Sequence, residues 1–145
     1  MNRREALSAG ALLIASVSML NAYDEKLIVN TKDIELQDPK NPTDFEYKHM
    51  PQIELKGKDE KGYTLVEITV GQEGIIHPSD ANHWVYAIEL YADDKLVAHA
   101  DLEPVISRGF LSARVQLEGI KELKSITKCN LHGNYSASIA IEKEA

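Results

Sequence analysis

The chain contains one cysteine and five histidines, and most of these residues stand at turn-like places rather than inside regular strands. Imidazole nitrogens and thiolates are the side-chain ligands that suit zinc, iron and copper in proteins. Five of the six could gather on loops at strand ends, where ligands usually collect: His49, His77, His83, Cys129 and His132. A structural zinc site takes four ligands, so five candidates leave a different geometry, with iron or copper, open.

The single cysteine limits what these residues can do. One thiol cannot form a disulfide within the chain, so Cys129 either pairs between chains or binds a metal. It lies three residues before His132 in the sequence CNLHG, a spacing that lets both side chains reach one ion. His77 is followed by a proline, and His83 comes six residues later. The remaining histidine, His99, lies inside an alternating segment, and we interpret it as a structural or surface residue.

An alternation of apolar and polar residues runs through most of the chain after residue 46 and predicts β-strands. We expect strands over the segments Tyr63–Val70, Trp84–Tyr91, Lys95–Ala100, Phe110–Leu117 and Tyr135–Ile141. A shorter strand is expected over Lys26–Asn30, and the rest of residues 23–46 is expected to be irregular. About seven short strands in roughly 100 residues predict an all-β fold, an immunoglobulin-like sandwich.

The same alternation predicts which side chains face the core. In the second of these strands, the inward residues are expected to be Trp84, Tyr86, Ile88 and Leu90. Asp93 and Asp94 then form a tight turn into the next strand. The strands therefore place turn segments, and with them the candidate ligands, at the ends of the sandwich.

Composition sets the class of protein. With 145 residues, 43% hydrophobic and 27% charged, the chain has room for one domain with an ordinary core. Its formal net charge is −7. Nucleic acid is therefore not expected as a partner, because phosphate binding needs a basic surface.

Residues 1–22 have the composition of an export signal. Arg3 and Arg4 precede an apolar stretch, Ala6–Leu20, which at about 15 residues is shorter than the ~20 needed to cross a bilayer. The paired arginines resemble a twin-arginine signal, with a general secretory signal or an uncleaved anchor as the alternatives. We therefore expect an exported, periplasmic domain over residues 23–145. Loss of the signal leaves a net charge of −8 on that domain.

Three segments of the chain resemble one family. KHMPQI (48–53), HPSDANHW (77–84) and CNLHG (129–133) occur in the order and with the residue types found in the single-iron superoxide reductases, or neelaredoxins. These proteins share their catalytic domain with desulfoferrodoxin. The likeness runs from about Glu46 to Ile141. The four-cysteine iron module of desulfoferrodoxin is missing, since the chain has one cysteine.

The resemblance implies a ligand set for one iron ion per chain. His49, His77, His83 and His132 would supply four equatorial nitrogens, and Cys129 would bind axially as thiolate. The opposite axial position would stay open. A thiolate ligand donates electron density to the metal, as it does in haem proteins.

The resemblance also implies an activity and partners. The protein would be an oxidoreductase that reduces superoxide by one electron to hydrogen peroxide. It would need an external electron donor, rubredoxin-like or another reductant. A homo-oligomer, tetramer or dimer, is expected on the same ground.

Three residues next to the first ligand carry further expectations. Lys48 matches the family's lysine at the mouth of the site, where its charge would attract superoxide and help to organise protons. Tyr47 stands where the family has a glutamate that binds the sixth position of the oxidised metal. Tyr47 could instead hydrogen-bond a water at that position or shield it. Glu46, one residue earlier, could replace the glutamate only if the loop is re-aimed.

Two other functions fit parts of the pattern. A copper electron-transfer protein on a β-sandwich uses two histidines, one cysteine and a weak axial methionine. No methionine follows Cys129, and two histidines would go unexplained. A non-catalytic immunoglobulin-like binding module is the other alternative.

Overall fold

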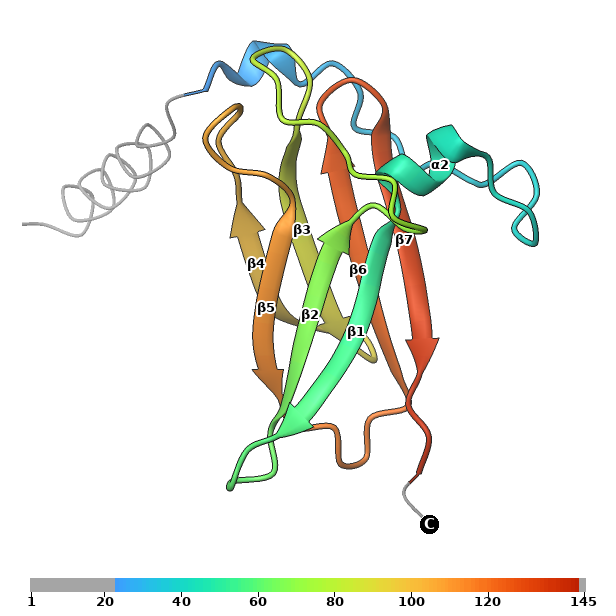
Figure 1. Ribbon diagram of the computed structural model, residues 1–145, viewed down its shortest axis with the longest axis vertical. Coiled ribbons are helices and arrows are strands. Elements are labelled where there is room, and N and C mark those ends of the chain that lie inside the picture. Colours follow the sequence, from blue (N-terminus) through green and yellow to red (C-terminus); the bar gives the residue numbers. More distant parts are fainter. Residues whose placement is uncertain (1–22, 144–145) are drawn as a thin grey trace, which may run out of the picture.

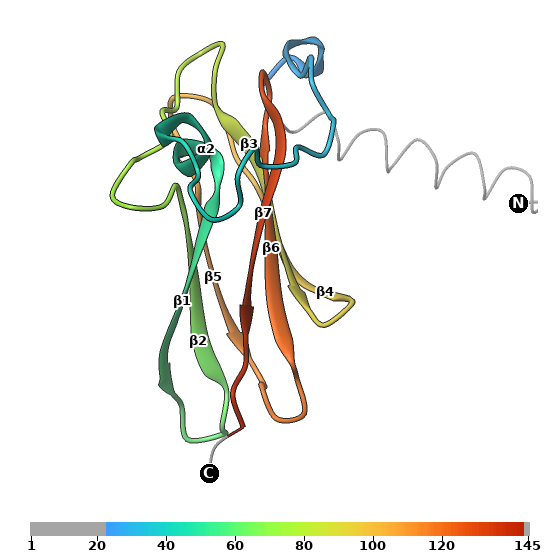
Figure 2. The same ribbon diagram turned by 90° about the vertical axis from the view of Figure 1, so that its right-hand side faces the viewer.

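The computed structural model describes residues 23–143 and contains seven β-strands in two antiparallel sheets. The strands are β1 (Pro51–Lys58), β2 (Thr64–Val70), β3 (Val85–Ala92), β4 (Lys95–Asp101), β5 (Phe110–Val115), β6 (Glu122–Cys129) and β7 (Gly133–Ala140). One sheet has the order β1-β2-β5 and the other β4-β3-β6-β7, and the two pack face to face (Figures 1 and 2). The predicted all-β sandwich of about seven strands is confirmed. The predicted export signal lies outside the described residues.

The core fills the space between the sheets with aliphatic side chains from alternating positions. In β2, Val66, Ile68 and Val70 are buried, and β3 and β6 contribute Ile88 and Leu123 from the opposite sheet. Fully burying each such side chain stabilises the fold by about 1.5–3 kcal/mol. The turns at the two ends are thus held by a packed scaffold.

The inward face of β3 differs from the predicted one. The pairing of β3 with β6 shifts register between Val85 and Ala87, as at a β-bulge. Val85 and Ala87 are consequently buried, and Tyr86 is only half-buried. Trp84, Ile88 and Leu90 are fully buried as predicted, and only the expectation for Tyr86 is wrong.

The segment before β1 also differs from the expectation. Instead of a strand over Lys26–Asn30, the chain forms a 3₁₀ turn at Glu25–Leu27, because the Asp24 carboxylate caps its first turn. A six-residue helix, α2 (Asp44–His49), follows where the sequence was expected to be irregular. Its start is a capping box: Glu46 N–H donates to the Thr43 hydroxyl, and the Glu46 carboxylate accepts from Thr43 N–H.

Gly71, directly after β2, allows the loop between β2 and β3 to lie against the end of α2. A Cβ at this position would overlap the Tyr47 carbonyl oxygen and come within 2.6 Å of the Lys48 carbonyl oxygen. Gln72 N–H also donates to the Tyr47 carbonyl at 2.9 Å. The glycine is needed for this close backbone approach, which fixes the two residues before His49.

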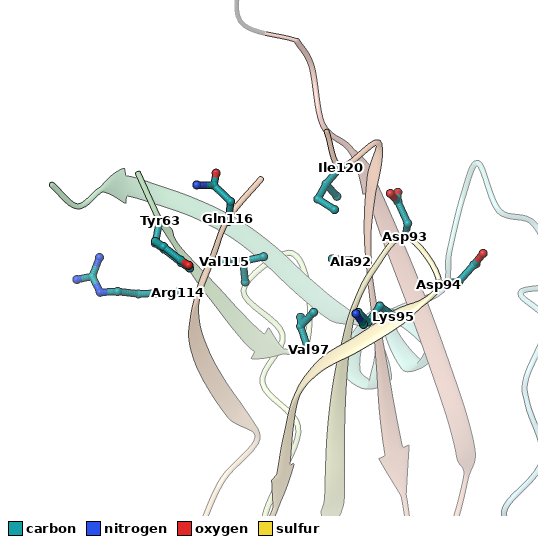
Figure 3. Close-up of a pocket in the computed structure, with 10 residues that line it drawn as sticks. All are labelled: Tyr63, Ala92, Asp93, Asp94, Lys95, Val97, Arg114, Val115, Gln116 and Ile120. Atoms are coloured by element: carbon teal, nitrogen blue, oxygen red, sulfur yellow. The ribbon is translucent and has the colours of Figure 1, made fainter. Parts of the chain in front are cut away.

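β4 and β5 are edge strands of the two sheets, and a cleft lies between them. It has a volume of about 780 Å³ and is lined among others by Tyr63, Val97 and Arg114 (Figure 3). It lies beside the β1–β2 and β3–β4 turns, at the end of the sandwich opposite α2 (Figure 1). Within residues 23–143, no helix has the length and apolar character needed to cross a membrane.

Candidate metal centre

The structure brings all five candidate ligands to the end of the sandwich that carries α2. His49 is the last residue of α2, and Cys129 is the last residue of β6. His132 lies in the short turn from β6 to β7. His77 and His83 lie in the long loop between β2 and β3. Three separate parts of the chain, α2, the β2–β3 loop and the β6–β7 corner, thus meet at one end of the sandwich.

The potential ligand atoms are close enough to share one ion. One such atom from each of His49, His83, Cys129 and His132 lies within 4.8 Å of the others. His132 Nδ1 is 3.1 Å from His49 Nε2 and 3.6 Å from the Cys129 sulfur. His77 joins the group through its ring, whose centroid is 4.7 Å from those of both His49 and His83.

Backbone carbonyls orient two of the imidazoles. His49 Nδ1 lies 2.7 Å from the Phe45 carbonyl oxygen, and His77 Nδ1 lies 2.7 Å from that of Pro78. A ring nitrogen that donates to a carbonyl leaves the other nitrogen with a lone pair for a metal. In both residues this other nitrogen is Nε2, whereas His132 turns Nδ1 toward His49 and Cys129.

Two ring nitrogens of the cluster have no hydrogen-bond partner in the part of the chain that the structure describes. They are His77 Nε2 and His83 Nε2, and both are buried. A buried polar atom without a partner is uncommon, because its lost hydration costs about 1–3 kcal/mol. A metal ion bonded to both nitrogens accounts for them.

Burial also sets the protonation of the site. It is the main reason that the pKa of His49 falls to about 4 and that of His77 to about 3. The pKa values of His83 and His132 are lowered for the same reason. Burial raises the pKa of the Cys129 thiol, against the opposing effect of hydrogen bonds from the Leu131 and His132 backbone N–H groups. At neutral pH the site therefore offers four neutral imidazoles and one protonated thiol.

This donor set fits a single iron ion. Four imidazole nitrogens and one sulfur exceed the four ligands of a structural zinc site. They also exceed the two histidines and one cysteine of the copper alternative. Ligand atoms of three histidines lie within 4.8 Å of one another and of the Cys129 sulfur, and the ring of the fourth, His77, packs against two of them.

The three residues before His49 lie in different surroundings. Lys48 is half-buried, and its charge contributes to the lowered pKa values of His49, His83 and His132, so it acts on the cluster. Tyr47 is half-buried as well. Glu46 is buried, and its two carboxylate oxygens accept from the backbone N–H groups of Thr43 and Gln37, at 2.9 and 3.1 Å. The structure thus favours Glu46 as a helix cap over Glu46 as a sixth ligand.

Sequence reasoning missed several residues that hold the site. The Phe45 ring packs against His49 and His132, with centroids 4.5 and 4.8 Å away. The Thr127 hydroxyl donates to the His49 carbonyl oxygen and so ties α2 to β6. Asn130, fully buried within the CNLHG motif, forms side-chain hydrogen bonds to two other segments, at Leu27 and at Asn82 and Trp84 on either side of His83. His99 lies apart on β4, 3.5 Å from Asp101, with an exposed side chain.

Comparison with known proteins identifies the family. A family model described as desulfoferrodoxin matches residues 41–138. The chain belongs to the desulfoferrodoxin family. Its relatives include a protein of Methanocaldococcus jannaschii named "Putative superoxide reductase", which is 36% identical over 114 residues, 71% of this chain and 91% of the relative.

Solved structures of proteins named superoxide reductase resemble the chain as well. The single-iron superoxide reductase of Giardia intestinalis has a TM-score of 0.56 at 25% identity, covering 65% of this chain and 98% of its own. A variant of the superoxide reductase (neelaredoxin) of Ignicoccus hospitalis has a TM-score of 0.54 at 29% identity, covering 68% and 82%. Both similarities extend over most of the sandwich.

Proton release should reveal the state of these ligands. Adding one equivalent of Fe²⁺ to the metal-free protein at pH 7 without oxygen is expected to release about one proton, because only the thiol must ionise. Titration calorimetry in buffers of different ionisation enthalpy measures this number. The Cys129→Ser variant should release almost none.

The affinity of the site for iron is expected to fall as the pH is lowered. Because the thiol must ionise, iron affinity should fall about tenfold for each pH unit below 7. Since burial lowers the pKa of His49 to about 4, its imidazole stays neutral on acidification down to that range, and iron affinity should fall more steeply below it. Release of several protons when Fe²⁺ binds at pH 7 would contradict neutral imidazoles in the metal-free protein.

Proposed function

We propose that this protein is a superoxide reductase that converts superoxide to hydrogen peroxide by one-electron reduction. The observation that carries the proposal is the meeting of four neutral imidazoles and one thiol at one point, in a chain of this family. The ligands of its single iron ion are His49, His77, His83, His132 and Cys129. Ferrous iron held by these residues would supply the electron, and the Cys129 thiolate would increase electron density on it.

The residues of the chain prepare this site before any substrate arrives. The Phe45 and Pro78 carbonyls keep His49 and His77 turned with Nε2 inward. The Leu131 and His132 backbone N–H groups stabilise negative charge on the Cys129 sulfur. Little rearrangement is then needed when a metal binds, which favours electron transfer at a fixed geometry.

Lys48 is the proposed catalytic residue beside the metal. The chain is negative overall and repels an anion at long range. Within about 8–10 Å, the screening length at ordinary salt, a local cation can outweigh that repulsion. Lys48 then attracts superoxide and holds a proton source next to the place where peroxide forms.

We assign different roles to the two residues before Lys48. Glu46 is a positioning residue, because its carboxylate caps the helix that ends in His49. Tyr47 is the residue that covers the open side of the site or hydrogen-bonds a water there. The Tyr47 carbonyl accepts a hydrogen bond from Gln72 N–H, which fixes the backbone that carries the phenol.

The reaction determines what the protein needs from outside. Superoxide takes one electron from the protein and two protons to become hydrogen peroxide, so each turnover leaves the site oxidised. An external donor, such as a rubredoxin-like protein, returns the electron.

A homo-oligomer is proposed as well, since the side chains of Leu96 and Val97 on β4 are 48% and 41% exposed. Sedimentation of the purified protein would test it.

Export is proposed from residues 1–22 alone. Paired arginines followed by a short, weakly apolar stretch support a twin-arginine signal and a periplasmic location. The Arg3→Lys, Arg4→Lys double variant should then stay in the cytoplasm on cell fractionation. Unchanged export of the double variant would exclude that route.

A direct assay tests the activity. Protein loaded with Fe²⁺ under anaerobic conditions should bind one iron per chain and convert each superoxide to one hydrogen peroxide while a reductant is supplied. A dismutase would instead yield one peroxide per two superoxide ions. The Cys129→Ala variant should lose activity on the order of 100-fold or more, together with its iron. A loaded wild-type protein that consumes no superoxide would refute the proposal.

The role of Lys48 can be separated from general charge effects. Lys48→Gln should lower the second-order rate constant for superoxide about tenfold and flatten its dependence on ionic strength. Stopped-flow measurements at several salt concentrations report both. Lys61→Gln removes an equal charge from the exposed β1–β2 turn at the far end and should change little. Equal losses in both variants would contradict a local role.

A further inference from the structure

Residues 27–34 cross the turn between β6 and β7 at the metal end of the molecule (Figures 1 and 2). We call this segment the N-terminal strap. It precedes residues 41–138, the part that matches the family model. The turn beneath it carries two of the ligands, Cys129 and His132.

Asn130, between these two ligands, joins the strap to the loop that carries His83. Its side chain is fully buried. The Nδ2 group donates to the Leu27 carbonyl at 3.0 Å and to the Asn82 carbonyl at 2.9 Å. Oδ1 accepts from Trp84 N–H at 2.9 Å. Both amide hydrogens and the carbonyl are therefore used, and the residues on each side of His83 are tied to the turn.

Backbone hydrogen bonds reinforce the same connection. The Asn130 carbonyl accepts from Val29 N–H at 2.9 Å and from Asn30 N–H at 3.3 Å. Asn130 N–H donates to the Trp84 carbonyl at 3.1 Å. The main chain of Asn130 is thus held on one side by the strap and on the other by the start of β3.

The strap continues along the turn and fits closely against it. Asn134 N–H donates to the Lys32 carbonyl at 2.8 Å, and Ile34 N–H donates to the Asn134 carbonyl at 2.9 Å. At Gly133, with φ 89°, a Cβ would lie 2.6 Å from the Lys32 carbonyl oxygen. Only glycine permits this approach.

The chain that follows the strap reaches a third ligand. Gln37 N–H donates to the Glu46 carboxylate at 3.1 Å, and Glu46 caps the helix that ends in His49. One continuous stretch, residues 27–37, therefore contacts the β6–β7 turn and the cap of α2. Four of the five ligands lie on segments that it contacts directly or through Asn130.

We propose that Asn130 is a positioning residue of the metal centre and that the N-terminal strap is a structural part of that centre. Three ligands, His83, Cys129 and His132, lie on two loops that Asn130 joins. Loosening this connection lets the loops move apart and alters the metal–thiolate bond. The proposal rests on the metal binding proposed above, and its test separates the two.

Two substitutions at Val29 test the strap, because one of them removes a single backbone hydrogen bond and the other keeps it. Val29→Pro deletes the N–H that donates to the Asn130 carbonyl, while the Val29 side chain is 69% exposed and the preceding Ile28 is already extended. Val29→Ala keeps the N–H and is the matched control. Leu123→Ala, in the core on β6, controls for a general loss of stability.

The first readout uses Fe²⁺ as the probe. Val29→Pro should release iron to a chelator roughly two- to tenfold faster than wild type, the factor that one hydrogen bond accounts for, and Val29→Ala should not. Asn130→Asp, which keeps the shape but loses both N–H donors, should release it more than about tenfold faster. Both should shift the visible absorption band of the oxidised thiolate–iron centre.

Leu123→Ala should lower the unfolding temperature but leave the absorption band in place. If Val29→Pro and Asn130→Asp behave like Leu123→Ala, the proposal is overturned.

The second readout needs no metal. In the metal-free protein, Val29→Pro should speed amide hydrogen exchange in the segments 82–84 and 129–132, compared with Val29→Ala. If wild type binds no iron, the proposed function fails, but exchange still decides whether the strap holds the two loops. If Asn130→Asp does not fold, the two Val29 variants decide alone. Unchanged exchange in Val29→Pro would refute the role of the strap.

Discussion

The structure depends on keeping four imidazoles unprotonated at one end of a β-sandwich. Two of them, His49 and His77, are fully buried, and His83 and His132 are half-buried. Each buried nitrogen without a partner costs about 1–3 kcal/mol, and two of them, His77 Nε2 and His83 Nε2, lie in the same cluster. The aliphatic core between the sheets offsets this cost. A metal bonded to these nitrogens removes it, so metal binding and the stability of this end of the fold are coupled.

Hydrophobic alternation predicted β2, β3, β4, β5 and β7, and it missed β1 and β6. β2 was readable from Val66, Ile68 and Val70. β6 was not, because Ser125 and Thr127 face inward, where their hydroxyls donate to the backbone carbonyls of Glu89 and His49. Such hydroxyls are compatible with burial only because of partners far away in the sequence, which no local pattern reveals. The helix α2 was missed as well, although Thr43 and Glu46 form the Thr-x-x-Glu pattern of a capping box.

The same distinction applies to the metal centre. Residue types and spacing were enough to name the five potential ligands. They did not show what holds the ligands together, because Asn130 and the strap act through backbone groups more than 40 residues apart in sequence. Any residue can offer a carbonyl or an N–H, so the strap has no signature of its own. Among the residues that contact the strap, Gly133 is the one whose type is required by the contact, because the Lys32 carbonyl lies too close for a Cβ.

The protonation of the site explains why a lysine stands beside it. The burial that keeps His49 and His77 neutral also removes the positive charge that exposed histidines could offer to an anion. The chain as a whole adds a net charge of −7. In the proposed function, attraction of superoxide would depend on the metal and on Lys48, whose charge already acts on three of the imidazoles. In this proposal, a half-buried lysine at the end of α2 supplies the positive charge that the imidazoles, which must stay neutral to bind iron, do not carry.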